Sequence, residues 1–169
     1  MRKALPPTET MLPAVRGTAV QLVSTLPPPV TAAPDDPPAQ SGFGRRVVYS
    51  KVQQRVWIVE ADGTVVRNFL VSGRLDQPNL GTFSVTSRSS YTCSITHTNI
   101  CMRWMVRFTK GPRGDNIGFH EIPRKNGAPI QTDSELGQAR SSGCVRQSTA
   151  DAQFMWSFAG IGTTVVVIS

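Results

Sequence analysis

The stretch Met102-Arg103-Trp104-Met105-Val106-Arg107-Phe108 carries the clearest structural pattern in this chain. Side chains of a β-strand alternate between two faces, and apolar residues recur here at every second position. The residues that would share one face are Met102, Trp104, Val106 and Phe108. The pattern therefore predicts a β-strand with one apolar face.

Further strand-like segments, rich in β-branched and aromatic residues, lie on both sides of this stretch. Asp62-Gly63 predicts a type I′ hairpin turn between residues 58–60 and 65–67. The other expected strands cover residues 47–49, 56–59, 81–86, 117–122 and 163–168. The last of these is continuously apolar, which predicts a strand that is buried on both faces. The fold class is therefore mainly β and mostly antiparallel.

One helix is expected near the end of the chain. Ser148, Thr149 and Asp151 supply the residue types that cap a helix N-terminus. Apolar residues follow at helical spacing up to Ala159, and Gly160-Ile161-Gly162 ends the pattern. Residues 123–140 carry proline, glycine and mixed charge without periodicity, which predicts a long loop.

The first forty residues differ in composition from the rest of the 169-residue chain. They hold nine of the 13 prolines, and their charges cancel. We expect residues 1–43 to form a disordered, Pro-rich tail or linker and residues 44–169 to form one domain. Arg2 and Lys3 resemble the start of an export signal, but Glu9 and Arg16 interrupt its apolar region, so no clear signal peptide is present.

The net charge of +7 comes from the folded part of the chain and indicates an anionic partner, either nucleic acid or a cell-wall polymer. The arginines are scattered and form no basic run with interleaved aromatic residues, which argues against nucleic acid. No run of eighteen apolar residues occurs, so no membrane-spanning helix is expected.

The three cysteines fall into two groups. Cys93 and Cys101 flank a short polar segment between two expected strands, where a disulfide can form, which would indicate an oxidising compartment. Two free thiols are the alternative, and a metal site with His97 would need a further ligand. Cys144 is the odd thiol and a candidate nucleophile.

Several features near Cys144 favour a reactive thiol. His120 can remove its proton, Arg146 adds positive charge, and the expected helix begins shortly after the cysteine. The amides of Gly143 and Cys144 can stabilise an oxyanion. One Cys and one His also fit an inert thiol and a surface histidine. These residues alone therefore indicate no more than a cysteine-nucleophile acyltransferase.

The block Ser141-Ser142-Gly143-Cys144-Val145-Arg146 resembles the signature of the L,D-transpeptidase catalytic domain, the YkuD-like family. That signature reads Ser/Thr-His-Gly-Cys, an apolar residue, then Asn or Arg. The resemblance covers residues 45–169, and further segments match segments of the family in the same order. These segments are Ser72-Gly73, Gly81-Thr82-Phe83-Ser84-Val85, Gly118-Phe119-His120, Asp151-Ala152 and Gly162-Thr163-Thr164-Val165-Val166-Val167.

The resemblance implies a β-sandwich with one short helix near the C-terminus, and a transpeptidase that cross-links peptidoglycan outside the cytoplasm. Cys144 would attack a stem tetrapeptide and release D-alanine, with His120 as base and then acid. Ser141 would orient His120, and Gly143 would contribute to the oxyanion hole. The substrate-binding residues would be Arg146, Ser142, Phe119 and Trp104, with Tyr91 also at the donor groove.

The expected partners are stem peptides and an anionic wall polymer, with no nucleic acid, no stable protein partner, and no metal or organic cofactor. Ser142 stands where the family signature has histidine, which affects substrate positioning or rate. The alternatives are an inactive wall-binding relative, an L,D-carboxypeptidase and a sortase-like acyltransferase. Arg146 can instead form a structural salt bridge, and the aromatic residues can instead pack in the core.

Overall fold

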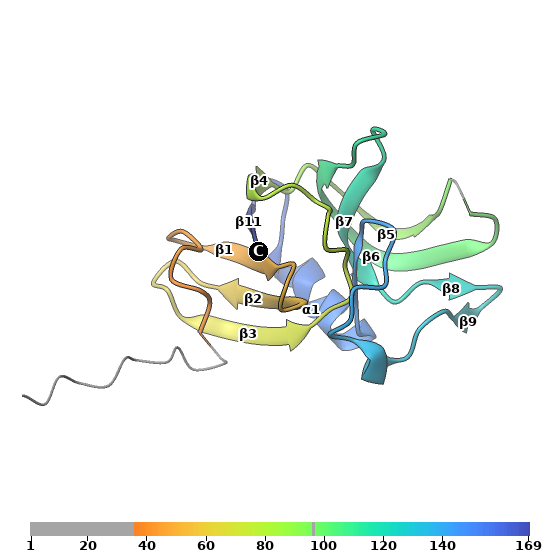
Figure 1. Ribbon diagram of the computed structural model, residues 1–169, viewed down its shortest axis with the longest axis horizontal. Helices are drawn as coiled ribbons and strands as arrows, with labels where there is room; N and C mark the ends of the chain where they lie inside the picture. Colours follow the sequence, from red (N-terminus) through yellow and green to blue (C-terminus); the bar gives the residue numbers. More distant parts are fainter. Residues whose placement is uncertain (1–35, 96) are drawn as a thin grey trace, which may run out of the picture. The chain divides into compact units, whose positions relative to one another are not determined.

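The computed structural model describes residues 36–95 and 97–169, and these residues form two β-sheets and one α-helix (Figure 1). Most of the predicted Pro-rich tail lies outside the described residues. The first sheet has the strand order β3-β2-β1-β11-β4. Its strands are β1 (Arg46–Ser50), β2 (Arg55–Val59), β3 (Val65–Leu70), β4 (Gly81–Ser84) and β11 (Thr164–Ile168).

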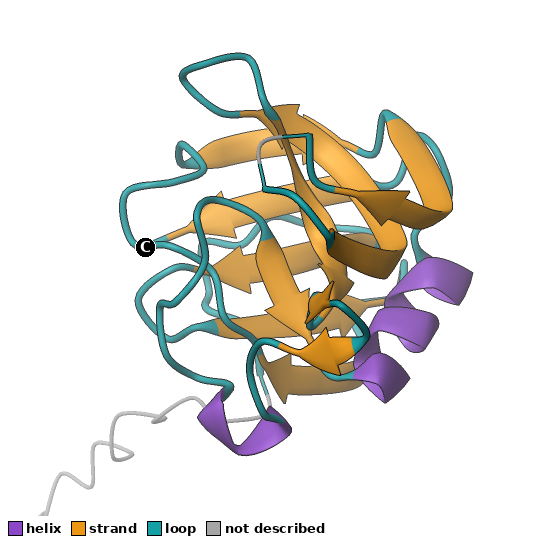
Figure 2. Ribbon diagram, turned by 90° about the vertical axis from the view of Figure 1, so that its right-hand side faces the viewer, coloured by secondary structure: helices purple, strands orange, loops and turns teal. Residues whose placement is uncertain are grey.

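The second sheet has the order β10-β7-β6-β8-β9, and β5 also pairs with β6. Its strands are β5 (Ser87–Cys93), β6 (Ile100–Lys110), β7 (Asn116–Glu121), β8 (Arg124–Lys125), β9 (Ala128–Pro129) and β10 (Val145–Gln147). Helix α1 (Thr149–Phe158) packs alongside the strands, and a short 3₁₀ helix η1 covers Asp133–Glu135 (Figure 2). None of the described helices is long and apolar enough to cross a membrane.

A single large core joins the two sheets and α1. Val47 and Val165 come from the first sheet, Val106 and Phe119 from the second, and Met155 from the helix. Phe108 and Phe119 stack with ring centroids 4.8 Å apart at the centre of this core. Burial of apolar surface from both sheets is the main stabilising contribution to a fold of this kind. The predicted mainly β sandwich with one short helix is confirmed.

Local predictions have mixed outcomes. The helix begins at its predicted cap, where the Ser148 side chain accepts a hydrogen bond from the Asp151 amide. The hairpin of β2 and β3 is confirmed, but its predicted type I′ turn is wrong, because Gly63 has a positive φ (92°) and Asp62 does not. The Asp62 carboxylate instead accepts a bond from the Thr64 amide.

The prediction of an unstructured loop over residues 123–140 is wrong in part. Strands β8 and β9 form a hairpin there, joined by Asn126 and Gly127, which both have positive φ (51° and 85°). Asn-Gly is the sequence signal for such a tight turn. The signal was available in the sequence, but the lack of periodicity around it favoured a loop.

Candidate active site

Cys144 immediately precedes β10, which lies parallel to β7. Val145 pairs with Phe119, and Arg146 pairs with His120. This register places Cys144 beside Gly118, two residues before His120 in β7. Because a strand rises about 3.3 Å per residue, Gly118 and His120 are separated by about 7 Å on one face. Parallel pairing of two short strands thus brings together two residues that are far apart in the sequence.

The sulfur of Cys144 lies against the first residues of β7. Its Sγ donates a hydrogen bond to the Asn116 carbonyl oxygen at 3.5 Å. Burial raises the pKa of the Cys144 thiol. The Gly118 amide and the guanidinium groups of Arg107 and Arg146 act in the opposite direction on this pKa, and the Asp115 carboxylate adds to the rise. The thiol is therefore held neutral at neutral pH.

His120 is almost fully buried, with 2% of its surface exposed. Burial lowers its pKa to about 4, so the imidazole is neutral at pH 7. Nδ1 lies 2.5 Å from the Glu121 carbonyl oxygen. A carbonyl oxygen only accepts, so Nδ1 carries the proton and Nε2 is the basic nitrogen. The Glu121 carbonyl thus selects the tautomer that can act as a base.

The loop before Cys144 is held by two hydrogen bonds of Ser141. Its amide donates to the Gly73 carbonyl oxygen at 3.0 Å, and its Oγ accepts from the Gly143 amide at 3.1 Å. Gly143 has φ +151°, and a Cβ there would lie 3.3 Å from Gln77 Oε1. Only glycine adopts this conformation without strain. Ser141 therefore shapes the loop that presents the thiol.

The whole folded part of the chain matches one family model. The L,D-transpeptidase catalytic domain, YkuD, matches residues 44–168. The chain belongs to the YkuD family of L,D-transpeptidase catalytic domains. No protein with a curated description matches the sequence.

Solved L,D-transpeptidases share the fold of this YkuD domain. An L,D-transpeptidase from Stackebrandtia nassauensis is 18% identical with a TM-score of 0.60, over 82% of this chain and 62% of that one. One from Xylanimonas cellulosilytica is 23% identical with a TM-score of 0.56, over 76% of this chain and 62% of that one. L,D-transpeptidase 3 from Mycobacterium tuberculosis, solved with a faropenem-derived adduct, is 20% identical with a TM-score of 0.55, over 76% and 61%.

The match covers only part of each solved chain. A fused Zn-dependent amidase/peptidase/peptidoglycan-binding protein from Clostridium acetobutylicum is matched over 51% of its length, with 17% identity over 73% of this chain and a TM-score of 0.56. The chain thus spans between about half and two thirds of the solved chains described here. At these identities the likeness establishes the shared fold.

Arg146 of this YkuD domain is held by a buried glutamine, Gln131, that no sequence motif marks. Arg146 Nη1 donates to Gln131 Oε1 at 3.1 Å. Gln131 Nε2 donates to Ser72 Oγ at 2.7 Å and to the Glu135 carbonyl at 3.1 Å. The alternative structural salt bridge of Arg146 is not found among the described residues. No sequence signal marks Gln131, because its role depends on the path of the 123–140 segment.

The Ser72-Gly73 segment lies against Tyr49 of β1 and against Gln54 in the turn between β1 and β2. The Gly73 amide donates to Gln54 Oε1 at 2.5 Å, and a Cβ on Gly73 would fall 1.9 Å from the Tyr49 hydroxyl. Burial raises the pKa of Tyr49 to about 12, so its hydroxyl keeps its proton. Glycine at position 73 therefore lets the backbone lie close to Tyr49, and the Gly73 carbonyl accepts the hydrogen bond of the Ser141 amide.

Three expectations about the surroundings of Cys144 are wrong. The N-terminus of α1 does not adjoin the thiol, because β10 lies between them. Ser141 makes its side-chain bond to the Gly143 amide, whereas the Glu121 carbonyl orients His120. Phe119 cannot line a substrate groove, because strand alternation turns it into the core, where it is completely buried.

The other expected residues are distributed as follows. Trp104 packs edge-to-face on Trp156 of α1, with ring centroids 5.6 Å apart, so packing is its observed role. Ser142 is exposed on the loop. Arg107, which pairs with Gly118, was missed because an arginine on a strand has no distinctive spacing. Cys93 and Cys101 pair across β5 and β6 as a disulfide with an S–S distance of 2.05 Å.

Proposed function

We propose that this YkuD domain is an active L,D-transpeptidase in which Cys144 is the nucleophile and His120 is the general base. The observation that carries the proposal is the parallel register of β10 with β7, which brings Cys144, the residue before β10, to the strand that holds His120, with Nδ1 of His120 bonded to the Glu121 carbonyl. Family membership supports peptidoglycan stem peptides as the substrates. A wall substrate in turn places the protein outside the cytoplasm, in agreement with the Cys93–Cys101 disulfide.

The first acyl transfer begins from a neutral thiol and a neutral imidazole. Nε2 of His120 takes the proton from Sγ of Cys144 as the sulfur attacks the carbonyl carbon of the third stem residue. The tetrahedral intermediate then collapses, and the C–N bond to D-alanine breaks. The imidazolium gives its proton to the leaving amine. The products of this step are a thioester on Cys144 and free D-alanine.

The second transfer reverses these roles. The side-chain amine of an acceptor stem attacks the thioester, and His120 removes a proton from that amine. The C–S bond breaks, Cys144 regains its proton, and a 3→3 cross-link is formed. Water in place of the amine would give a tripeptide, which is the carboxypeptidase outcome. The acceptor therefore determines which of the two activities is observed.

The oxyanion of each tetrahedral intermediate needs hydrogen-bond donors. We assign the backbone amide of Cys144 as the first of these donors. The Gly143 amide donates to Ser141 Oγ and becomes a second donor when that hydroxyl rotates away. Arg146, held in place by Gln131, is the cation that we assign to a substrate carboxylate.

The reaction is tested with purified disaccharide-tetrapeptide muropeptides, the wild-type chain and the Cys144→Ala variant. We expect cross-linked dimers and free D-alanine from the wild type by mass spectrometry, and neither product from the variant. Free D-alanine with tripeptide alone would indicate a carboxypeptidase. An unchanged substrate with both proteins would leave the non-catalytic wall-binding alternative. A sorting-signal peptide assayed in parallel tests the sortase-like alternative.

A further inference from the structure

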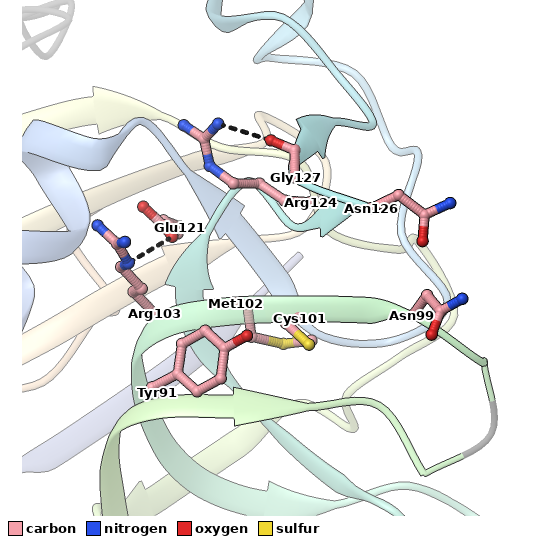
Figure 3. A pocket seen from close by; sticks show the side chains of 9 residues that line it. All are labelled: Tyr91, Asn99, Cys101, Met102, Arg103, Glu121, Arg124, Asn126 and Gly127. Atoms are coloured by element: carbon pink, nitrogen blue, oxygen red, sulfur yellow. Dashed lines mark hydrogen bonds and ion pairs between the residues drawn. The ribbon is translucent and has the colours of Figure 1, made fainter.

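A cavity of about 370 Å³ lies between the β5–β6 hairpin and the β8–β9 hairpin (Figure 3). Neither Cys144 nor His120 lines it. Glu121 follows His120 in β7 and reaches this cavity, since strand alternation turns the two side chains to opposite sides of the sheet. The volume is within the range of small-ligand sites. The cavity is thus separate from the proposed active site.

The charged groups of this cavity leave an excess of positive charge. Arg103 and Arg124 contribute two guanidinium groups, and Glu121 contributes one carboxylate. Glu121 is buried and already has partners: Thr149 Oγ1 donates a hydrogen bond to it at 3.3 Å, and Arg103 Nε forms an ion pair with it at 4.0 Å. Arg124 donates to the Gly127 carbonyl at 3.2 Å and makes no ion pair within the part of the chain that the structure describes. A guanidinium keeps several further donors, so an anion is the complementary ligand.

The rim of the cavity adds neutral donors and an aromatic ring. Asn99 and Asn126 both have positive φ (63° and 51°), and the Asn126 amide donates to the Asn99 carbonyl at 3.1 Å, which joins the two hairpin tips. The Tyr91 side chain lies on the other side, on the strand next to Arg103 (Figure 3). Tyr91 is 61% exposed, although its ring is a large apolar surface. An exposed ring beside hydrogen-bond donors is suited to the apolar face of a sugar.

We propose that this cavity binds an anionic saccharide, with the sugar ring on Tyr91 and its phosphate or carboxylate group on Arg124 and Arg103. The site gives the positive charge of the domain a defined point of contact with an anionic wall polymer. Binding here does not depend on the chemistry at Cys144. Loss of the transpeptidase activity would therefore leave this proposal standing.

The disulfide supports the geometry of this cavity. Cys101 lines it, and Cys93 pairs with Cys101 in the same register in which Tyr91 pairs with Arg103. The covalent link therefore keeps the two strands aligned two residues from the ligand-facing pair. Reduction of the disulfide removes that constraint and should weaken binding.

The proposal is tested by titrating the full chain with glucose 1-phosphate and with glucuronate, followed by NMR chemical shifts. Glucose and inorganic phosphate are the comparison ligands. We expect at least one charged sugar to bind ten-fold or more tightly than glucose and than phosphate. The stronger of the two charged sugars shows whether the site prefers a phosphate group or a carboxylate group. Equal binding of glucose would refute the role of the anion, and equal binding of phosphate would refute the role of the ring.

Matched variants locate the site. Arg124→Ala should weaken binding about ten-fold, Arg124→Lys less, and Tyr91→Ala several-fold more than Tyr91→Phe. Arg113→Ala removes the same charge at an exposed arginine of the β6–β7 turn and should leave binding unchanged. Cys144→Ala should also bind normally. Equal losses in Arg124→Ala and Arg113→Ala, or no binding by the wild type, would overturn the proposal. Circular dichroism and the milder Arg124→Lys variant separate a binding effect from misfolding.

Discussion

Cys144 and His120 lie beside and in the second sheet at a place where burial suppresses charge, whereas Arg103 and Arg124 keep permanent charges in a cavity on the other side of that sheet. At the first place, burial raises the pKa of the thiol and lowers that of the imidazole to about 4. At the second, the Arg103 side chain is 61% exposed and remains hydrated. This difference in burial shows that one sheet supplies two environments, one suited to proton transfer and the other to binding an anion.

The largest expected effect comes from removing the base. His120→Gln keeps a polar side chain of similar size but cannot accept and return a proton. General-base catalysis contributes about 10²- to 10⁴-fold, so acylation of Cys144 should fall by that factor. Stopped-flow acylation by a carbapenem measures this rate.

The same variant should bind charged sugars normally, because His120 does not line the hairpin cavity. A His120→Gln protein that lost both acylation and sugar binding would contradict the separation of the two environments. Unchanged acylation would contradict the assignment of His120 as the base.

Removal of the disulfide should have the opposite effect to His120→Gln: it should weaken sugar binding and leave acylation nearly unchanged. Replacing Cys93 and Cys101 together by serine opens a loop with a sequence separation of 8. The chain-entropy estimate for a loop of this size is about 2–3 kcal/mol in the free energy of unfolding. Urea denaturation measures this loss. Sugar binding should weaken, while acylation of Cys144 by a carbapenem should stay within about two-fold of the wild type. A loss of acylation larger than the loss of sugar binding would refute this division.

Substitution of Gln131 tests whether this glutamine positions Arg146, the cation that we assign to a substrate carboxylate. Gln131→Ala removes the hydrogen bonds that the Gln131 side chain makes with the Arg146 guanidinium and with Ser72 Oγ. We expect kcat/KM for the muropeptide to fall about ten-fold, mainly through KM, since one charge-assisted hydrogen bond contributes about 1.5–3 kcal/mol. Gln131→Glu keeps an acceptor for Arg146 and should recover part of the loss. Equal defects in both variants would show that Gln131 acts only through stability.

A further expected effect is in the pH dependence of stability. The pKa of His120 is about 4 in the folded chain and about 6.5 when unfolded, so the unfolded state binds more protons between these values. The free energy of unfolding should therefore rise with pH from about 4 to 6.5. His120→Gln should lack this part of the rise. A parallel pH profile in both proteins would contradict the buried neutral state of His120.

Much of this architecture was predictable from local sequence patterns. The cap at Ser148 and the apolar run before Ser169 predicted α1 and β11. Alternation over residues 102–108 predicted the strand β6, but the predicted single apolar face is wrong in part, because Trp104 has a positive φ (58°) and Met105 is buried next to Val106. The β8–β9 hairpin was missed because Asn126-Gly127 lies between strands of only two residues. Such short strands have no measurable periodicity.

The candidate site was predictable only in part. Cys144 and His120 were identified from a motif, but their relative position depends on the parallel register of β10 and β7, which is a long-range contact. The same register turns Phe119 into the core and places Arg107 beside Gly118. Gln131 and the Glu121 carbonyl act through tertiary hydrogen bonds that no spacing in the sequence encodes.

The most direct measurement is the detection of the acyl-enzyme itself. The wild-type chain is mixed with disaccharide-tetrapeptide, quenched in acid within the first turnovers, digested and mapped by tandem mass spectrometry. We expect a thioester on the peptide that contains Cys144, with a mass equal to the muropeptide less one D-alanine. Released D-alanine without any adduct on Cys144, or an adduct on another residue, would contradict Cys144 as the nucleophile.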